Sequence, residues 1–439
     1  MTGSDNPTRR TLLQGIAGAS TAATLSIAGC TQIEGFGGGG DSSTLEFWSS
    51  PNEEEVSFHE SAAEEFTADN DIELEVRPVP EGDSSEEVVL SALASGTEPD
   101  AFANVFPGFA AQLEVNDAAV NLYDIEGAKQ ALTERCGEEI LSRYETPDGD
   151  LYQAPWKANP VLFQYNDTVF EEAGYEEEDY PRTLDALVEA GIEIVDSGAA
   201  EVLWDRAPLP TWYERWFDFL PIYFAASEGK AEMFTQNGET TEPAFNNDTA
   251  VTVLQFFQDL FESDLLPTQS SENPKFPENK AAINTGGPWV VPYFEDVNED
   301  VRMSHHTAPV PDDVEPNAHT YADPKNTTVF QSSSNAEAVW SFTAFELGED
   351  WDVRLLEDTL QLPHREGIID SASSFFEENP DIKPYAEALE TSHPPSYTPD
   401  YTKVMDIFGD EAFVPVVRGN RSPEKGLNAA EQKITEELE

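Results

Sequence analysis

The chain has 439 residues, enough for two or three domains, and 39% of them are hydrophobic and 11% aromatic, too many for a disordered acidic tail. Asp and Glu number 86 against 23 Lys and Arg, so the formal net charge is −63, which excludes nucleic acid as a partner. Carboxylates repel one another over a Debye length of about 30 Å at 0.01 M salt but only about 3 Å at 1 M. The composition therefore predicts a folded protein of a halophile, with a haloarchaeon favoured.

The first 29 residues have the organisation of an export signal. Arg9 and Arg10 precede an apolar, alanine-rich run without further charge, and small residues close the run at 27–29. Adjacent arginines are typical of twin-arginine export. A membrane-spanning anchor is the alternative, but a span needs about 20 strongly apolar residues, and this run is rich in Ala, Gly, Ser and Thr. The pattern favours a cleaved signal peptide.

Cys30 is predicted to carry a lipid, because residues 27–30 resemble the lipobox of secreted lipoproteins. Residues 30–43, with four glycines at 37–40, then form a flexible tether between the lipid and the folded part. Cys136 is the second of two cysteines, so we expect no intrachain disulfide and no metal site. The expected location is the extracellular face of the cell membrane, with the membrane reached through the lipid anchor.

Strands and helices are predicted to alternate after the tether. Residues 44–50, 72–76 and 100–106 have the alternation or apolar character of strands, and each precedes a run with apolar residues at helical spacing. This order is typical of a parallel sheet covered by helices. Ligands of such sheets bind beyond the carboxyl ends of the strands. The loops at 49–52 and 106–109 are therefore candidate ligand-binding segments.

Further elements are predicted downstream. An aromatic stretch punctuated by prolines at 152–166 is expected to be extended. Helices are predicted after Thr183, which is a good N-cap, after Asp248, and at 336–347, since apolar residues recur there at helical spacing. A Gly-Gly-Pro-Trp turn separates two apolar segments within 278–294. No internal repeat of fixed period is present.

A series of segments resembles the extracellular solute-binding proteins of ABC importers, specifically the maltose-binding-like group that carries sugars. The segments follow one another in the family's order and together cover residues 44–439, which makes the series more specific than any one motif. They are LEFWSS, VVLSALASGTEPDAFANV, AAQLEVNDAAVNLYDI, GDLYQAPWKANPVLFQYNDTVFEEAGYEEEDYPRTLDAL, AVTVLQFFQDLFESDLLP, NKAAINTGGPWVVPYF, LPHREGI and RGNRSPEKGLNAAEQKITEEL.

The resemblance implies an α/β, two-lobed, periplasmic-binding-protein-like fold with hinged lobes and mixed, mainly parallel sheets. By analogy, lobe one comprises residues 44–157 and 309–362, and lobe two comprises 158–308 and 363–439. It further implies a monomer that is not an enzyme, has no cofactor, binds a solute in the cleft and closes by hinge motion. The loaded protein is expected to dock on ABC transporter permease subunits, near which the lipid anchor concentrates it.

Sugar sites combine flat aromatic faces with polar groups for the hydroxyls. Trp289 follows the Gly-Gly-Pro turn in a loop that the family uses for binding, although a tryptophan there can instead pack the hinge. Lys157 is notable where cations are so scarce, although it can also serve as a surface cation that relieves acidic repulsion. Few basic residues in the expected cleft loops favour a neutral mono- or oligosaccharide over phosphorylated or dicarboxylate ligands. The expected ligand-binding residues are Trp289, Gly287, Trp156, Lys157, Asn159, Trp212, Tyr213, Phe106, Phe109, Ser49, Ser50 and Arg365.

An extracellular glycoside hydrolase or another carbohydrate-active surface protein is the alternative function. A hydrolase needs two carboxylates at a defined separation, but 86 acidic residues make such pairs uninformative. No G-x-S-x-G, H-E-x-x-H or P-loop motif occurs. The adjacent His305 and His306 would point to opposite faces of a strand, which disfavours a metal carrier.

The chain also contains Asn-x-Ser/Thr triplets. Such triplets are candidates for N-glycosylation on a cell surface, and they also arise by chance. Their asparagines are Asn166, Asn247, Asn326 and Asn420.

Overall fold

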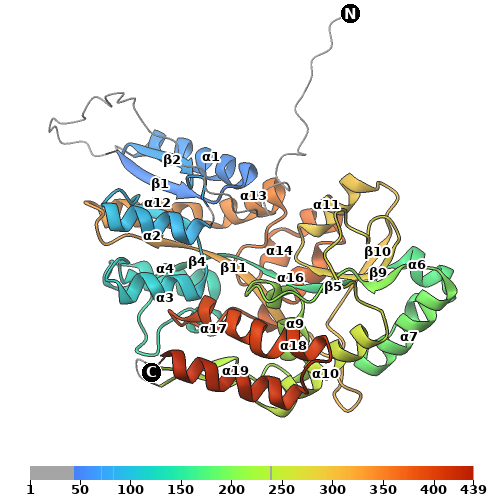
Figure 1. The fold of residues 1–439 in the computed structure, drawn as a ribbon. Helices are drawn as coiled ribbons and strands as arrows, with labels where there is room; N and C mark the ends of the chain where they lie inside the picture. Colours follow the sequence, from blue (N-terminus) through green and yellow to red (C-terminus); the bar gives the residue numbers. More distant parts are fainter. Residues whose placement is uncertain (1–43, 71, 83, 238–239, 439) are drawn as a thin grey trace, which may run out of the picture. The chain divides into compact units, whose positions relative to one another are not determined.

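Two mixed β-sheets and the helices around them organise residues 44–70, 72–82, 84–237 and 240–438, the part of the chain that the computed structural model describes (Figure 1). The predicted signal peptide, Cys30 and the tether lie outside these residues. No helix in the described part is long and apolar enough to cross a membrane. The predicted α/β class with mixed sheets is confirmed.

The first sheet has the strand order β12-β11-β3-β1-β2, and β4 pairs with the far part of β11. β1 is parallel to both β2 and β3, as predicted, whereas β11 runs antiparallel to β3 and β4. Antiparallel pairs are therefore more numerous than expected, because the long strand β11 runs antiparallel beside the parallel strands β1, β2 and β3 and also pairs with β4. The strands are β1 (Leu45–Ser49), β2 (Leu74–Pro78), β3 (Ala101–Val105), β4 (Ala154–Pro160), β11 (Thr320–Val329) and β12 (Ser392–His393).

Local capping explains where the helices of this sheet begin and end. The Asn52 side chain accepts hydrogen bonds from the first turn of α1, and the Ser84 side chain does the same for α2. Gly96 ends α2 in the left-handed conformation that suits a glycine. The helices of this part are α1 (Glu53–Asp69), α2 (Ser85–Ser95), α3 (Pro107–Val115), α4 (Ala128–Cys136), α5 (Glu138–Ser142), α12 (Ala336–Glu346) and α13 (Glu349–Thr359), with a 3-10 turn at Leu122–Asp124.

The second sheet has the order β10-β5-β9-β6, in which β6 is parallel to β9 and the other pairs are antiparallel. The Thr183 side chain caps α7, and Asn247 caps α10, so these two helices begin as predicted. The elements are β5 (Leu162–Asn166), β6 (Val202–Trp204), β9 (Ala281–Gly286), β10 (Met303–His306), α6 (Asp167–Glu172), α7 (Leu184–Ser197), α8 (Glu214–Phe217), α9 (Phe219–Ala226), α10 (Asp248–Glu262) and α11 (Val290–Val297), with a 3-10 turn at Glu177–Asp179 and a hairpin of β7 (Phe234–Asn237) and β8 (Thr240–Pro243).

The C-terminal helices return to the second part of the fold. Helices α18 and α19 pack along α10, and the three lie side by side in Figure 1. A π-helical turn, Gly409–Phe413, joins α17 to α18. The remaining helices are α14 (Ile368–Ser371), α15 (Ser373–Glu378), α16 (Lys383–Glu387), α17 (Tyr401–Phe408), α18 (Val414–Val417) and α19 (Pro423–Leu438), with a 3-10 turn at Leu389–Thr391.

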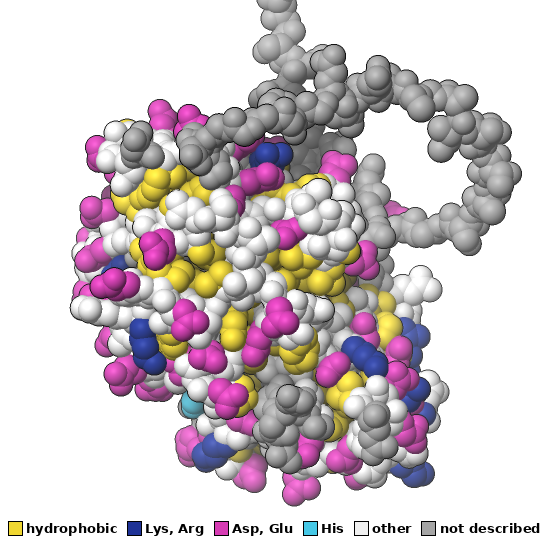
Figure 2. Space-filling model, turned by 90° about the vertical axis from the view of Figure 1, so that its left-hand side faces the viewer, with side chains coloured by type: hydrophobic (Ala, Val, Ile, Leu, Met, Phe, Trp, Pro, Cys, Tyr) yellow, Lys and Arg dark blue, Asp and Glu magenta, His cyan; other side chains and the backbone are white. Residues whose placement is uncertain are grey.

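The surface has the acidic character that the composition predicts. Figure 2 shows one face of the molecule, with Asp and Glu side chains spread across it and few Lys or Arg side chains between them. The carboxylates are dispersed over the face rather than gathered into one patch. Their mutual repulsion is therefore a property of the surface as a whole, and dissolved salt screens it.

Candidate functional site

Strands β4 and β11, which we call the crossing strands, extend past the carboxyl ends of β1 and β3. Val105, the last residue of β3, lies opposite Asn326 of β11, and Asn326 in turn lies opposite Pro155 of β4. The next pair along these two strands, Lys325 and Lys157, is therefore beyond the end of β3. This is the edge at which an α/β sheet binds its ligands.

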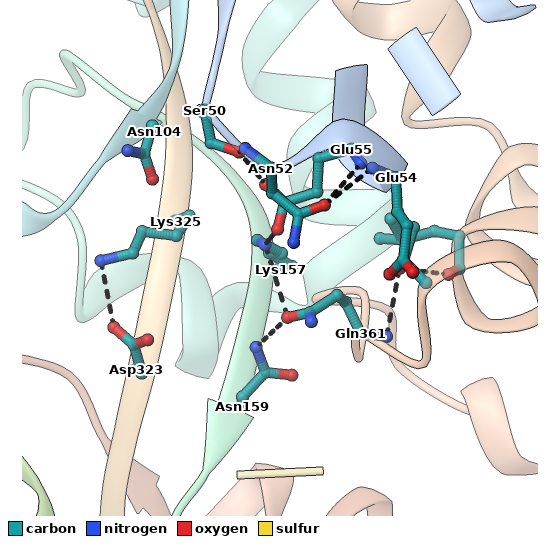
Figure 3. Close-up of polar contacts among 12 residues, drawn as sticks. Ser50, Asn52, Glu54, Glu55, Asn104, Lys157, Asn159, Asp323, Lys325 and Gln361 are labelled. Atoms are coloured by element: carbon teal, nitrogen blue, oxygen red, sulfur yellow. Dashed lines mark hydrogen bonds and ion pairs between the residues drawn. The ribbon is translucent and has the colours of Figure 1, made fainter. Parts of the chain in front are cut away.

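A buried polar network surrounds Lys157 (Figure 3). The Lys157 ammonium lies 2.5 Å from Glu55 Oε1 and 3.4 Å from Gln361 Oε1. Ser50 Oγ donates to the other Glu55 oxygen at 2.7 Å, and Asn159 Nδ2 donates to Gln361 Oε1 at 2.6 Å. The network joins the first turn of α1, strand β4 and the segment after α13.

The Glu55–Lys157 pair is an ion pair removed from water, with the side chains 8% and 4% exposed. Burial acts to raise the pKa of Glu55, but the Lys157 charge and the hydrogen bonds from Lys157 and Ser50 outweigh it and hold that pKa below its ordinary value. The carboxylate therefore remains ionised at neutral pH and neutralises the ammonium. The Asn159 side chain also has protein partners for both of its polar atoms, since its Nδ2 donates to Gln361 and its Oδ1 accepts the backbone N–H of Leu362 at 3.1 Å.

A second ion pair lies on β11. Lys325 Nζ is 3.2 Å from Asp323 Oδ1, and both side chains are partly exposed. The ammonium also lies 5.1 Å from the ring centroid of Trp216 and 5.9 Å from that of Phe106, within the range of cation–π attraction. Figure 3 shows Lys325 and Asp323 on the strand beside the Lys157 network. The sequence did not predict this pair, although an Asp and a Lys spaced by two place their side chains on one face of a strand, which was a usable signal.

Aromatic rings gather beside Lys325. Phe106 stacks on Trp212 with centroids 5.5 Å apart and an angle of 29°, and it meets Trp216 edge-on at 5.6 Å. Trp216 is buried, stacks on Tyr321 at 5.3 Å and donates its indole N–H to Tyr401. Trp212 is only partly buried, so it keeps free ring surface. The structure thus brings together four of the predicted aromatic residues, Phe106, Phe109, Trp212 and Tyr213, and adds Trp216 and its partners.

The loop that carries Trp212 is held from behind by the C-terminal helices. Asp406 of α17 accepts the backbone N–H of Trp212 at 2.9 Å. Burial raises the pKa of Asp406, and this hydrogen bond partly opposes the rise. At Gly409, in the π-helical turn, a Cβ atom would lie 2.0 Å from the carbonyl oxygen of Pro210. Only glycine permits this approach, which fixes the loop's position. Tyr213, on the same loop, is 38% exposed.

A second aromatic group forms after β9. The Trp289 ring folds back over Gly287, where a Cβ would lie 2.0 Å from Cζ3 of the indole. Trp289 meets Phe217 edge-on with centroids 6.0 Å apart, and the Arg206 guanidinium lies 5.8 Å from the Phe217 ring. Arg206 Nη1 is 3.5 Å from Glu214 Oε2. Burial raises the pKa of Glu214, and Arg206 partly offsets the rise.

Other predicted ligand residues point into the protein. Trp156 and Phe109 are fully buried, and Trp156 packs against the rings of Phe58 and His59. Ser49 is likewise fully buried. Arg365 Nε donates to Asp352 at 2.6 Å, in an ion pair that is shared with Arg135.

None of the predicted aromatic residues lines either of two hollows in the described structure. The larger, of about 580 Å³, opens behind the Trp212 loop, and the smaller measures about 190 Å³. No group of three or more His, Cys, Asp or Glu among the described residues is arranged to hold a metal ion. The larger hollow is lined by Gln112, Pro399, Asp400, Thr402, Lys403, Asp406, Ile407, Asp410 and Glu437, and the smaller by Ala131, Leu132, Glu134, Arg135, Trp340, Ala344, Leu347 and Arg365.

Comparison with known proteins gives one family and many similar structures. Residues 49–352 match the family described as bacterial extracellular solute-binding protein. No curated protein matches the chain significantly. The structure of an uncharacterized protein from Listeria monocytogenes EGD-e is 30% identical, with a TM-score of 0.79, and the match covers 89% of this chain and 99% of that one.

Two sugar-binding proteins share the fold at lower identity. The cyclic alpha-maltosyl-1,6-maltose binding protein from Arthrobacter globiformis is 22% identical with a TM-score of 0.77, over 90% of this chain and 99% of that one. A cyclo/maltodextrin-binding protein complexed with maltotetraose is 18% identical with a TM-score of 0.73, over 91% of this chain and 98% of that one.

Proposed function

The chain belongs to the family of bacterial extracellular solute-binding proteins, and we propose that it captures a neutral mono- or oligosaccharide and delivers it to the permease of an ABC importer. The family match confirms the resemblance that the sequence carries. The family is one of binding proteins, which confirms the prediction that the chain is not an enzyme. The similar structures confirm the two-lobed, periplasmic-binding-protein-like fold.

The balance of charge beside the aromatic rings is the observation that carries the sugar proposal. Each cation near these rings has a carboxylate partner, so the group holds no surplus positive charge for a phosphate or a dicarboxylate. Ion pairs also offer both donors and acceptors to hydroxyls, and exposed ring faces suit the apolar side of a sugar. Sugars named for two similar structures support the same ligand class. The pairs are Lys157–Glu55, Lys325–Asp323 and Arg206–Glu214.

We propose that Trp212, Tyr213 and Trp289 provide the ring surfaces, whereas Phe106, predicted as a ligand residue, is only 2% exposed and supports the Trp212 ring by stacking on it. Lys325 and Asp323 are proposed to meet hydroxyl groups, because their side chains are partly exposed beside Phe106. The remaining predicted residues are proposed to support the site without contacting the ligand. We propose that Ser50, Lys157 and Asn159 hold strand β4 against α1 and the segment after α13, and that Gly287 makes room for the Trp289 ring. Trp156, Phe109, Ser49 and Arg365 are proposed to act through packing.

The two sheets support a division into two lobes. We propose that lobe one contains the first sheet except β12, essentially 44–157 and 309–362, and that lobe two contains the second sheet, essentially 158–308 and 363–439. The short strand β12 lies in the second of these ranges but pairs with β11 of the first sheet. Strand β4 continues to Pro160 and β5 begins at Leu162. We therefore propose that the chain crosses between lobes at Val161, three residues beyond the boundary drawn from the resemblance. Hinge motion at the crossings would close the lobes on the ligand.

We propose that Cys30 anchors the mature protein to the extracellular face of the membrane after twin-arginine export. The extracellular location of the family supports this, as does the signal-like sequence before Cys30. The chain purified from its own cells should begin with a lipid-modified Cys30. The Cys30→Ala variant should leave the membrane fraction and enter the medium, and retention of this variant in the membrane would contradict the proposal.

A thermal-shift screen tests the sugar proposal. The full chain in molar KCl is heated with neutral sugars, polyols, sugar phosphates and peptides, and each ligand that acts is then titrated calorimetrically. A ligand at 100 times its dissociation constant stabilises the native state by about 2.7 kcal/mol. We expect a neutral sugar to raise the melting temperature and to be recovered unchanged. Binding by only phosphorylated ligands or peptides, or consumption of the sugar, would refute the proposal.

A further inference from the structure

The Asn-x-Ser/Thr triplets at Asn166 and Asn326 are closed to a modifying enzyme that acts on the folded protein, as twin-arginine export would require. Both side chains are 0% exposed. The Asn166 Nδ2 group donates to the backbone oxygen of Phe276 and to Asn279 Oδ1, each at 2.9 Å. The Asn326 Nδ2 group donates to Gln153 Oε1 at 2.7 Å. Neither nitrogen can be reached while the protein is folded.

The triplet at Asn247 is closed for a different reason. Asn247 is partly exposed, but its side chain caps α10 by accepting the N–H of Ala250 at 3.0 Å. Its Nδ2 donates to the Tyr223 hydroxyl at 2.7 Å and to the backbone oxygen of Ala244 at 3.0 Å. Both amide hydrogens therefore have acceptors, and a bulky group on this nitrogen would displace the side chain from the start of α10.

The triplet at Asn420 has the opposite character. Asn420 and Ser422 are both exposed, in the turn between α18 and α19. The turn is held by its backbone, since the Asn420 N–H donates to the Pro415 carbonyl at 2.8 Å and Gly419 has a φ of 69°. It is also held by Arg421, whose guanidinium donates to the Glu411 backbone oxygen at 2.6 Å. The Asn420 side chain can thus carry a large substituent without loss of the turn.

We propose that Asn420 is an N-glycosylation site. The donor is a lipid-linked oligosaccharide phosphate, and the chain meets it outside the cell, where the family operates. The bond between the first sugar carbon and the phosphate oxygen breaks, and a bond forms from that carbon to Asn420 Nδ2. The nitrogen loses one proton, which leaves with the lipid phosphate, and no oxidation or reduction occurs. The exposed Ser422 hydroxyl completes the triplet that the transferring enzyme reads.

Glycopeptide mapping of the full chain from the cells that naturally produce it tests this assignment. Cleavage after glutamate isolates the peptide between Glu411 and Glu424, which contains Asn420 and neither Asn166, Asn247 nor Asn326. We expect this peptide to carry the mass of a glycan and the peptides of the other three triplets to carry none. An unmodified Asn420 peptide would overturn the proposal, and so would a glycan on a buried triplet.

Matched variants test whether the glycan depends on the Asn420 triplet and not on a change in the fold. Ser422→Ala and Asn420→Gln should each remove the glycan, whereas Thr249→Val, which breaks the Asn247 triplet without touching its cap, should leave the glycan pattern unchanged. Sugar affinity should be the same with and without the glycan, so this test does not depend on the proposed ligand. A glycan that persists in Ser422→Ala would overturn the assignment.

Discussion

Lys157→Met is the substitution that best separates a structural role from a ligand role for Lys157. The Lys157 ammonium and Glu55 Oε1 are 2.5 Å apart and almost fully buried. With an effective dielectric constant of about 20, this separation corresponds to an attraction of about 7 kcal/mol, much of which desolvation of the two ions cancels. Methionine keeps the length of the stem but leaves the carboxylate buried and unpaired, which typically costs about 3–5 kcal/mol.

The cost converts into a measurable change in melting temperature. Unfolding entropy is about 2.1 cal/mol/K per residue near 60 °C, so a folded unit of about 400 residues has roughly 0.8 kcal/mol/K. A loss of about 4 kcal/mol therefore lowers the melting temperature by about 5 °C. Calorimetry at pH 7 in molar KCl measures this. Lys383→Met is the matched control, because the Lys383–Glu387 pair is exposed, at 49% and 58%, and such pairs contribute at most about 1 kcal/mol.

A double variant completes the test. Glu55→Gln in the Lys157→Met background removes the unpaired carboxylate, so the double variant should be more stable than the two single losses predict. Sugar affinity of the folded Lys157→Met protein should fall only modestly. A melting temperature equal to that of Lys383→Met would refute the energetic reasoning. Loss of sugar binding without loss of stability would show that Lys157 is a ligand residue.

The same pair predicts a pH dependence. The pKa of Glu55 is lower in the folded protein than its ordinary value of 4.5. A carboxylate with a lowered pKa contributes stability that is complete above the unfolded-state pKa and is lost as the pH falls through the folded-state pKa. The difference in unfolding free energy between the natural protein and Glu55→Gln should therefore shrink as the pH falls from 5 toward 3. A difference that is constant over this range would contradict the ion pair.

Three further substitutions test the rest of the site. Trp212→Ala removes the ring stacked on Phe106, worth about 0.5–1.5 kcal/mol beyond its buried area, and should weaken calorimetrically measured sugar binding about tenfold; unchanged affinity would exclude it from the site. Gly409→Ala places a Cβ 2.0 Å from the oxygen of Pro210. The substitution should lower the free energy of unfolding by about 1–3 kcal/mol, shift the tryptophan fluorescence and weaken sugar binding. A variant whose stability, fluorescence and sugar affinity equal those of the natural protein would argue against the loop contact. Arg365→Met should lower the melting temperature but leave affinity within about twofold, and a folded variant that fails to bind would return this residue to the ligand set.

Local signals were sufficient to predict the first three strands, the helices that follow them and the helices after Thr183 and Asn247, but not β11 or the C-terminal helices. Asn52 and Thr183 are short polar residues before apolar periodic runs, and both cap helices as such residues do. The three predicted strands before residue 107 occur within two residues of their expected bounds. The alternation of apolar and polar residues and the start of the following helix both depend only on residues that are close in the sequence. The order of segments along the chain was enough to identify the family.

The arrangement of side chains in the site depends on contacts between distant parts of the chain. Glu55 and Lys157 are 102 residues apart, and Gln361 is a further 204 from Lys157, so no local pattern predicts that the three meet. Lys325 was overlooked because its place beside Phe106 follows from the register of β11 against β3. Trp156 was expected in the cleft, and it faces the core because the side chain of one strand residue and that of the next point to opposite sides. Periodicity in the chain specifies which residues are strand and helix, but strand register and helix packing specify which of them face the ligand.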